Sequence, residues 1–195
     1  MEMYRGTLTV NSITADPANL APALRQALEY EAEVVVLLVK PGVTPVNMEE
    51  RLQIALEVLD TAIQVHFPLT RLYLDPLFHL KPDPVSWQLS RGLPDIDAVL
   101  ETIFMLPQLS NEKIRTLVAL SNVSQFLPAT KRPRVHLQLL PMLLSVGLDA
   151  VILNCDDSRL MEIVRTPQEE KGENLQGFQL IPQAEVAFDT ATIPW

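Results

Sequence analysis

The chain has 195 residues, of which 48% are apolar and 20% charged, and its formal net charge is −9. A chain of this length and apolar content can bury one core, which excludes a disordered protein. The acidic balance argues against a surface for nucleic acid or anionic membranes, and the single cysteine excludes an internal disulfide bond. Because no apolar run is long enough to span a membrane and Glu2 is followed by no apolar stretch, we expect a soluble, cytoplasmic protein.

Five short runs of apolar, mostly β-branched residues recur along the chain, and each of them ends close to a polar residue. In chain order, the runs are Thr7–Asn11, Glu33–Val39, Arg71–Asp75, Thr116–Asn122 and Ala150–Asn154. Runs that are apolar almost throughout are typical of parallel strands that are buried on both faces of a sheet. We therefore predict five parallel strands.

Segments with apolar residues at helical spacing alternate with these runs. They are Asn19–Tyr30, Met48–Val65, Asp97–Leu106, Arg134–Val146 and a short last one at Ser158–Val164. The resulting order of strand and helix repeats five times, and the crossovers are long enough for right-handed βαβ units. The segment from Phe78 to Pro94 is long for a loop, which favours a lid or an insertion. We interpret residues 166–195 as a C-terminal extension and residues 1–165 as the domain.

Polar residues stand at the predicted strand ends, where parallel α/β folds bind their ligands. These residues are Asn11, Lys40, Asp75, Asn122 and Asn154. Three amides, a carboxylate and an amine around one cleft suit a flat heterocycle with alternating donors and acceptors. Each residue also has a structural interpretation, because a strand-end asparagine often forms a turn or cap and an aspartate before proline often starts a turn.

Other candidate residues carry weaker signals. Asp156 and Asp157 precede Ser158 and are expected to cap the last helix. The three histidines show no metal-ligand spacing, and Cys155 has no histidine nearby in sequence to activate it as a nucleophile. A basic cluster follows the fourth run, and it is either a solvated loop or an anion contact. Its members are Lys131, Arg132 and Arg134.

Four motifs near the strand ends appear in one order and at suitable spacing. They are Leu72-Tyr73-Leu74-Asp75-Pro76-Leu77, Val99-Leu100-Glu101-Thr102-Ile103, Leu120-Ser121-Asn122-Val123-Ser124-Gln125 and Gly147-Leu148-Asp149-Ala150-Val151-Ile152. Together they resemble the pterin-binding methyltransferases that move a methyl group from methyltetrahydrofolate to a corrinoid protein. The dihydropteroate synthases are broader relatives of that family. The resemblance covers residues from about 7 to about 165 and implies a (β/α)8 TIM barrel.

The resemblance implies a role for five residues of this sequence. Asn11 matches an asparagine that bonds the pterin ring, and Asp75 matches the aspartate that binds the amino-pyrimidine edge. Asn122 matches the asparagine near N5, where the methyl group leaves, and is the catalytic candidate. Gln125 and Arg132 match loop residues that line the same pocket.

This sequence also departs from the family pattern. Asn11 corresponds to the fourth strand of the barrel, so this chain holds about five strand–helix units, strands four to eight, and is N-terminally truncated relative to the family. The loop after Gln125 carries extra residues, and His136 stands where the family usually has an asparagine. Five strands of a barrel leave two open edges. We expect these edges to be completed by a second chain with the missing strands, by a homo-oligomer, or by the extension from Thr166 to Trp195.

These observations predict a function at the family level. The chain is expected to be the C-terminal part of an enzyme that moves a methyl group from methyltetrahydrofolate to a corrinoid on a separate protein. On this interpretation the chain itself needs no metal. The alternative is a truncated, non-catalytic homologue that binds a pterin or a partner protein, or an assembly protein with no small ligand.

Overall fold

Five parallel strands form the centre of the computed structural model, which describes residues 6–78, 96–124 and 128–166. The strands are β1 (Thr9–Thr14), β2 (Glu33–Leu37), β3 (Leu72–Asp75), β4 (Arg115–Ala119) and β5 (Ala150–Ile152). They pair in chain order, β1-β2-β3-β4-β5, and every pair is parallel. The prediction of five parallel strands is confirmed.

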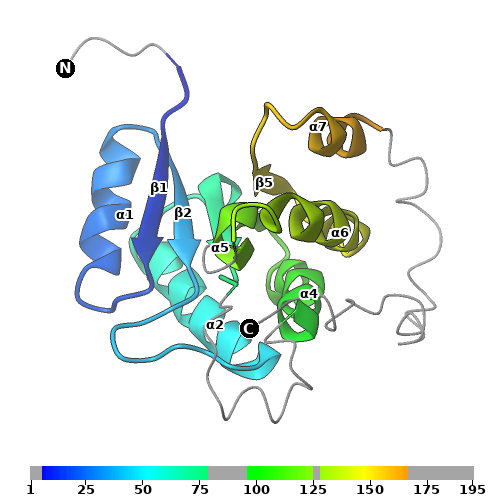
Figure 1. Ribbon diagram of the computed structural model, residues 1–195. Coiled ribbons are helices and arrows are strands. Elements are labelled where there is room, and N and C mark those ends of the chain that lie inside the picture. The colour runs from blue at the N-terminus through cyan, green and yellow to red at the C-terminus, as the bar shows by residue number, and fades with distance from the viewer. Residues whose placement is uncertain (1–5, 79–95, 125–127, 167–195) are drawn as a thin grey trace.

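Helices follow the strands in regular alternation (Figure 1). They are α1 (Leu20–Glu29), α2 (Met48–Gln64), α4 (Ile96–Met105), α5 (Leu120–Ser124), α6 (Arg132–Ser145) and α7 (Ser158–Arg165), with short 3₁₀ helices η1 (Leu69–Arg71) and η2 (Leu106–Leu109). The caps explain two of the helix starts. The Asn47 side chain accepts from the Glu50 N–H at 2.8 Å, and the Asp157 side chain accepts from the Arg159 N–H at 3.1 Å.

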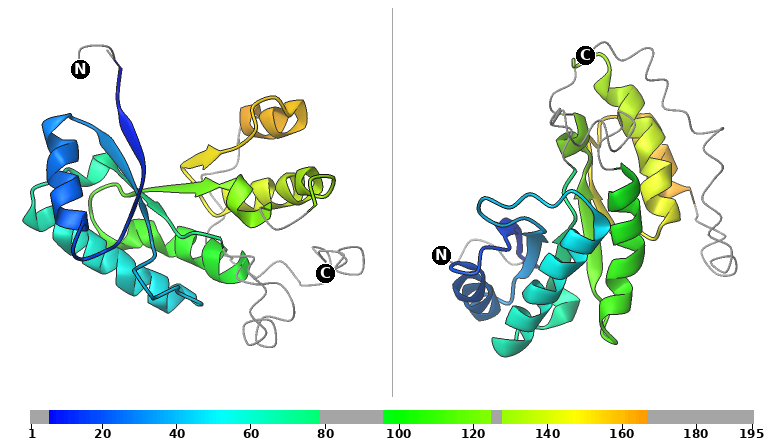
Figure 2. Two further views of the ribbon diagram at one scale, coloured as in Figure 1. Left: turned by 60° about the vertical axis from the view of Figure 1, so that its left-hand side comes forward. Right: turned by 90° about the horizontal axis from the view of Figure 1, so that it is seen from below.

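A strand order that follows the chain order places successive right-handed crossovers on the same face of the sheet. Accordingly, α1, α2, α4, α6 and α7 pack as a row of neighbours, and Figures 1 and 2 show them around one side of the twisted sheet. The sheet is not closed among the described residues, because β1 and β5 each pair with one neighbour only. The expectation of a partial (β/α)8 barrel with about five units is confirmed.

Two apolar clusters fill the space between the sheet and the helices. The first joins one face of β2 and β3, including Val36 and Leu74, to α1 and α2. The second joins Val118 of β4 to α4 and α6, where Leu139 and Leu140 are fully buried. Side chains of alternate strand residues point to the two faces of a sheet, so the remaining residues lie on the opposite, inward face.

The strand register identifies the residues of this inward face. Val35 pairs with Tyr73 and Leu37 with Asp75, while Tyr73 pairs in turn with Arg115. Because paired residues point to the same face, the face carries Tyr73 and Arg115 near the amino ends of their strands and Asp75 at the carboxyl end of β3. The inward face therefore carries polar residues at both ends.

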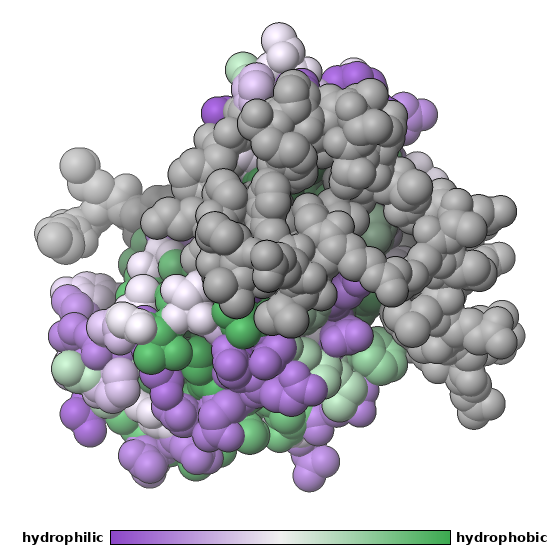
Figure 3. Space-filling view, turned by 60° about the horizontal axis from the view of Figure 1, so that its bottom comes forward, coloured by the Kyte–Doolittle hydropathy of each residue, from purple (hydrophilic) through white to green (hydrophobic). Residues whose placement is uncertain are grey.

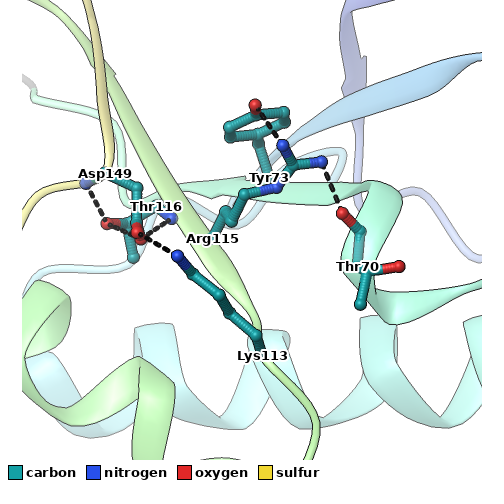
Figure 4. A network of polar contacts seen from close by, with 6 residues as sticks. All are labelled: Thr70, Tyr73, Lys113, Arg115, Thr116 and Asp149. Carbon is teal, nitrogen blue, oxygen red and sulfur yellow. Dashed lines mark hydrogen bonds and ion pairs between the residues drawn. The ribbon is translucent and has the colours of Figure 1, made fainter.

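Arg115 organises the amino end of the inward face. Its guanidinium donates to the Tyr73 hydroxyl at 2.6 Å and to Glu33 at 2.7 Å, and it lies 4.0 Å from the centroid of the Tyr73 ring. Figure 4 shows a further hydrogen bond to the Thr70 carbonyl and, beside it, the contact between Thr116 and Asp149. One cation thus links β2, β3 and β4.

Replacing Arg115 with methionine is expected to lower the free energy of unfolding by about 2 kcal/mol, because Glu33 and the Tyr73 hydroxyl lose a half-buried partner. Urea denaturation monitored by circular dichroism measures this change. The control is Lys113→Met, since the Lys113 side chain is 70% exposed and its ion pair with Asp149 is long at 3.4 Å. Equal denaturation midpoints for the two variants contradict the prediction.

The outer surface mixes polar and apolar residues. On the face in Figure 3, hydrophilic residues are interspersed with apolar ones where residues are coloured. Among the apolar residues of α2, Leu56 and Ile63 are exposed. Across the described ranges, no helix has both the length and the apolarity that a membrane span requires. The long segment after Phe78 and the extension after residue 166 lie outside the described residues.

Candidate functional site

Asp75 is the most deeply buried carboxylate among the described residues. It is the last residue of β3, on the inward face, and it is 2% exposed. Its Oδ1 accepts a hydrogen bond from the Leu77 N–H at 2.8 Å, and its backbone carbonyl accepts from the Leu38 N–H at 2.8 Å. Burial raises the pKa of Asp75 to about 7, although the hydrogen bond from Leu77 opposes this shift. The carboxyl therefore changes charge near neutral pH.

The turn after Asp75 is held by a residue that the sequence analysis missed. Arg51 of α2 is completely buried, and its Nε donates to the Pro76 carbonyl at 2.9 Å. Leu77, the next residue, has a φ of +55°, in the left-handed region that residues other than glycine seldom adopt. Helical spacing was the available signal, because Arg51 lies three and four residues before the buried Ile54 and Ala55.

Asn11 lies on β1, the edge strand, and its side chain is exposed. Asn11 pairs with Val35, which pairs with Tyr73, so Asn11 is in register with Tyr73 and not with Asp75. The register shifts by one residue after Asn11, and Thr14 is the β1 residue in line with Asp75. Asn11 and Asp75 thus share a sheet, two strands apart and at different levels.

Asn122 lies on a helix, which corrects the prediction of a strand through residue 122. Strand β4 ends at Ala119, and α5 begins at the next residue. The reason is the spacing of the buried residues Leu120, Val123 and Ser124, which is helical and not alternating. Asn122 is half-buried, one turn beyond the carboxyl end of its strand.

His136 of α6 anchors this short helix. Its Nε2 lies 2.7 Å from the hydroxyl oxygen of Ser124, which is 1% exposed. Burial lowers the pKa of His136, as does Arg132, whereas a hydrogen bond to the Leu120 backbone and the charge of Asp157 raise it. His136 therefore contacts both the first and the last residue of α5, the helix that carries Asn122.

Ser124→Ala is expected to lower the free energy of unfolding by about 1–2 kcal/mol, because it leaves a half-buried ring nitrogen without its partner. Thermal or urea denaturation checks this value. Ser121→Ala, which removes an exposed hydroxyl from the same helix, is the matched control and is expected to change little. If the two variants are equally stable, the hydrogen bond does not hold α5.

The other predicted residues have separate surroundings. Lys40 forms an ion pair with Glu57 of α2, and Asn154 accepts a hydrogen bond from the Asp156 N–H at 3.1 Å, as a turn residue does. Arg132 is the exposed first residue of α6, and Gln125 lies outside the described residues. Asp157 caps α7 as predicted.

Titratable side chains do not gather into a metal site in the described parts of the chain. No group of three or more histidine, cysteine, aspartate or glutamate side chains there could hold a metal ion. Cys155 is exposed. At the carboxyl end of the sheet, the structure therefore has one buried carboxyl on a tightly held turn, and Asn122 lies on the helix that follows the neighbouring strand β4.

Comparison with known proteins bears on the fold of this chain. No protein-family model matches the chain. Among solved structures, the chain is similar to dihydropteroate synthase of Xanthomonas albilineans, determined with 4-aminobenzoic acid, with a TM-score of 0.54 and 15% sequence identity. The match covers 81% of this chain and 64% of the synthase chain, so this chain spans less than two thirds of the synthase. The described residues therefore have a fold similar to part of dihydropteroate synthase.

Proposed function

We propose that this chain binds a pterin at the carboxyl end of its sheet, with Asp75 as the principal anchor. The observation that carries the proposal is a buried carboxyl on the inward face of a sheet with a dihydropteroate-synthase-like fold. Parallel α/β folds bind their ligands at this end of the strands. Burial of a carboxyl costs stability, and such costs accumulate at functional sites.

The chemistry of Asp75 suits the amino-pyrimidine edge of a pterin. This edge presents a ring N–H and an amino group side by side, and a carboxylate can accept both with its two oxygens. One oxygen already accepts from the Leu77 N–H, but each carboxylate oxygen has a second lone pair. Asp75 in its ionised form is thus able to bind the edge without leaving its turn.

We further propose that the pterin is methyltetrahydrofolate and that the reaction is methyl transfer to a corrinoid on a separate protein. The resemblance of the motifs around Asp75 and Asn122 to the methyltransferase family supports this finer assignment. The C–N bond to the methyl group breaks while N5 keeps the bonding electrons and a proton, and the methyl group passes to the cobalt(I) centre. Protonation makes N5 a leaving group. The Asn122 amide can donate a hydrogen bond to neutral N5 or accept one from protonated N5.

Three other residues have roles in this proposal. Asn11 contacts the pterin ring, while Gln125 and Arg132, the first residue of α6, line the pocket. In support, the backbone places Asn11 on the inward side of β1 and Arg132 at the end of α6 that lies next to α5 in the chain. These roles depend on the family resemblance.

The open sheet bears on the partners of the protein. Strands β1 and β5 are edges among the described residues, and unpaired edge groups favour pairing with further strands. We propose that such strands come from a second chain, from a second copy of this chain, or from another part of the same polypeptide. A corrinoid protein is the proposed partner in the reaction.

A non-catalytic binding module is the second candidate function. The observation that favours it is the separation of the polar residues, because Asn11 lies level with Tyr73 and Asn122 lies on a helix beyond its strand. A site that retains Asp75 but lacks a complete set of contacts would bind a pterin without turnover. Methyl transfer to a corrinoid acceptor distinguishes this candidate from the enzyme.

Calorimetric titration of the purified chain with methyltetrahydrofolate tests the proposal. We expect micromolar binding that Asp75→Ala abolishes, with the fold of the variant checked by circular dichroism. Asp60→Ala, on the exposed side of α2, is the control and is expected to bind like the wild type. Absence of binding by a folded wild-type chain contradicts the proposal.

A further inference from the structure

Arg51 is an arginine whose whole side chain is buried, and the proposed function gives it no role. It is 0% exposed and lies on the buried side of α2, with Ile54, Ala55 and Val58. Arginine is almost never fully buried unless its charge and its donors are satisfied, because removal of a charge from water is costly. The burial of Arg51 at this position must therefore be explained by its local contacts.

The contacts of Arg51 connect two segments that are far apart in sequence. Nε donates to the Pro76 carbonyl at 2.9 Å, and a terminal nitrogen donates to the Asn47 carbonyl at 3.0 Å. Asn47 caps the start of α2, whereas Pro76 directly follows Asp75. The rigid planar guanidinium thus joins the start of a long helix to the turn in which the buried carboxyl lies.

Three unusual features meet at this turn. The Arg51 cation is buried, the Asp75 carboxyl is buried, and Leu77 has a left-handed backbone conformation. A left-handed backbone conformation is strained for a residue other than glycine. Such features persist where the surroundings enforce them, and they concentrate at functional sites.

We propose that Arg51 is a positioning residue, which fixes the Asp75–Leu77 turn against α2 and so holds the Asp75 carboxyl in place for its ligand. This inference rests on the proposed function. Arg51 acts through the Pro76 carbonyl and touches no pterin itself. A freed turn would let Leu77 relax, withdraw its N–H from Asp75 and admit water to the carboxyl.

Arg51→Lys in the full chain tests the proposal. Lysine keeps the charge but presents a single nitrogen, so it cannot reproduce the two-point contact of the guanidinium. We expect methyltetrahydrofolate affinity to fall about tenfold, because misplacement of an anchor by even ~1 Å is costly. We also expect the titration midpoint of the Asp75 carboxyl carbon, followed by NMR, to move down toward that of an ordinary aspartate, because relief of burial outweighs loss of the Leu77 hydrogen bond.

Arg115→Lys is the matched control. It makes the same chemical change in an arginine that also joins several elements, but at the amino end of the sheet. We expect it to lower stability while the Asp75 midpoint and the affinity stay unchanged. If Arg51→Lys does not fold, Arg51→Met replaces it, since an apolar side chain places no cation in the core.

The outcomes separate the two proposals. An Asp75 midpoint that shifts in the Arg51 variant but not in the control, together with weaker binding, supports the positioning role. A midpoint that shifts in the Arg51 variant, together with a wild-type chain that binds no methyltetrahydrofolate, supports the hold of Arg51 on the turn but overturns the pterin function. An unchanged Asp75 midpoint in a folded Arg51 variant overturns the positioning role.

Discussion

Asp75→Asn is expected to make the protein more stable at neutral and alkaline pH while it weakens pterin binding. The folded state raises the pKa of Asp75 from 3.8 to about 7, so the folded protein holds a proton that the unfolded chain releases. Stability is therefore lost as the pH rises from about 4 to about 7, and the loss is complete above that. A shift of this size corresponds to roughly 4 kcal/mol. Asparagine carries no charge and avoids this cost.

Urea denaturation of wild type and Asp75→Asn at several pH values measures the effect. The variant's advantage should grow by roughly 3 kcal/mol between about pH 4.5 and about pH 8. Asp60→Asn, an exposed carboxylate on α2, is the control and should show little change in the difference with pH. A difference that stays constant with pH shows that the Asp75 carboxyl is not held in its neutral form.

The alternation of strands and helices could be predicted from the sequence because it depends on the local spacing of apolar residues. The β-branched run of β2 and the apolar spacing of α2 are each sufficient to identify their element. One segment is an exception. Residues 116–122 looked like one strand because all their apolar residues are consecutive, yet the buried side chains of Leu120 and Val123 belong to a helical turn.

The candidate site could be predicted only where a single residue carries the signal. Asp75 stands at a strand end before a proline, and the structure shows it there. Arg51 could not be assigned to the site, because its contact with Pro76 joins residues 25 apart in the chain. The partnership of Ser124 and His136 likewise depends on how α5 packs against α6. Such tertiary contacts have no pattern in a single sequence.

The two ends of the inward face show how the same residue types serve different purposes. At the amino end, the carboxylate of Glu33 has the guanidinium of Arg115 at 2.7 Å, and the pair joins strands. At the carboxyl end, Arg51 donates to backbone carbonyls at 2.9 Å and 3.0 Å, and Asp75 accepts from a backbone N–H. The two charges of the Glu33–Arg115 pair neutralise each other and join strands. The Asp75 carboxyl accepts from a backbone N–H and still has oxygen lone pairs with which to accept hydrogen bonds from a ligand.

The affinity for methyltetrahydrofolate is expected to weaken as the pH falls below about 7. The proposed ligand donates two hydrogen bonds, which only the ionised Asp75 can accept together, so a proton competes with the pterin for the same carboxyl. With the pKa of Asp75 at about 7 in the free protein, the dissociation constant should rise about tenfold for each pH unit below that value. Above it, the affinity should level off.

Calorimetric titrations between about pH 6 and about pH 8, in buffers with different enthalpies of ionisation, measure both the affinity and the protons released. Binding at about pH 6 should release close to one proton, because the ligand drives the neutral carboxyl to its ionised form. Asp75→Asn should bind weakly with no such dependence, which separates the titration of Asp75 from that of the ligand. Affinity and proton release that remain constant over this range in the wild type would show that Asp75 does not meet the ligand as an acceptor, and the pterin would then need another anchor on the inward face.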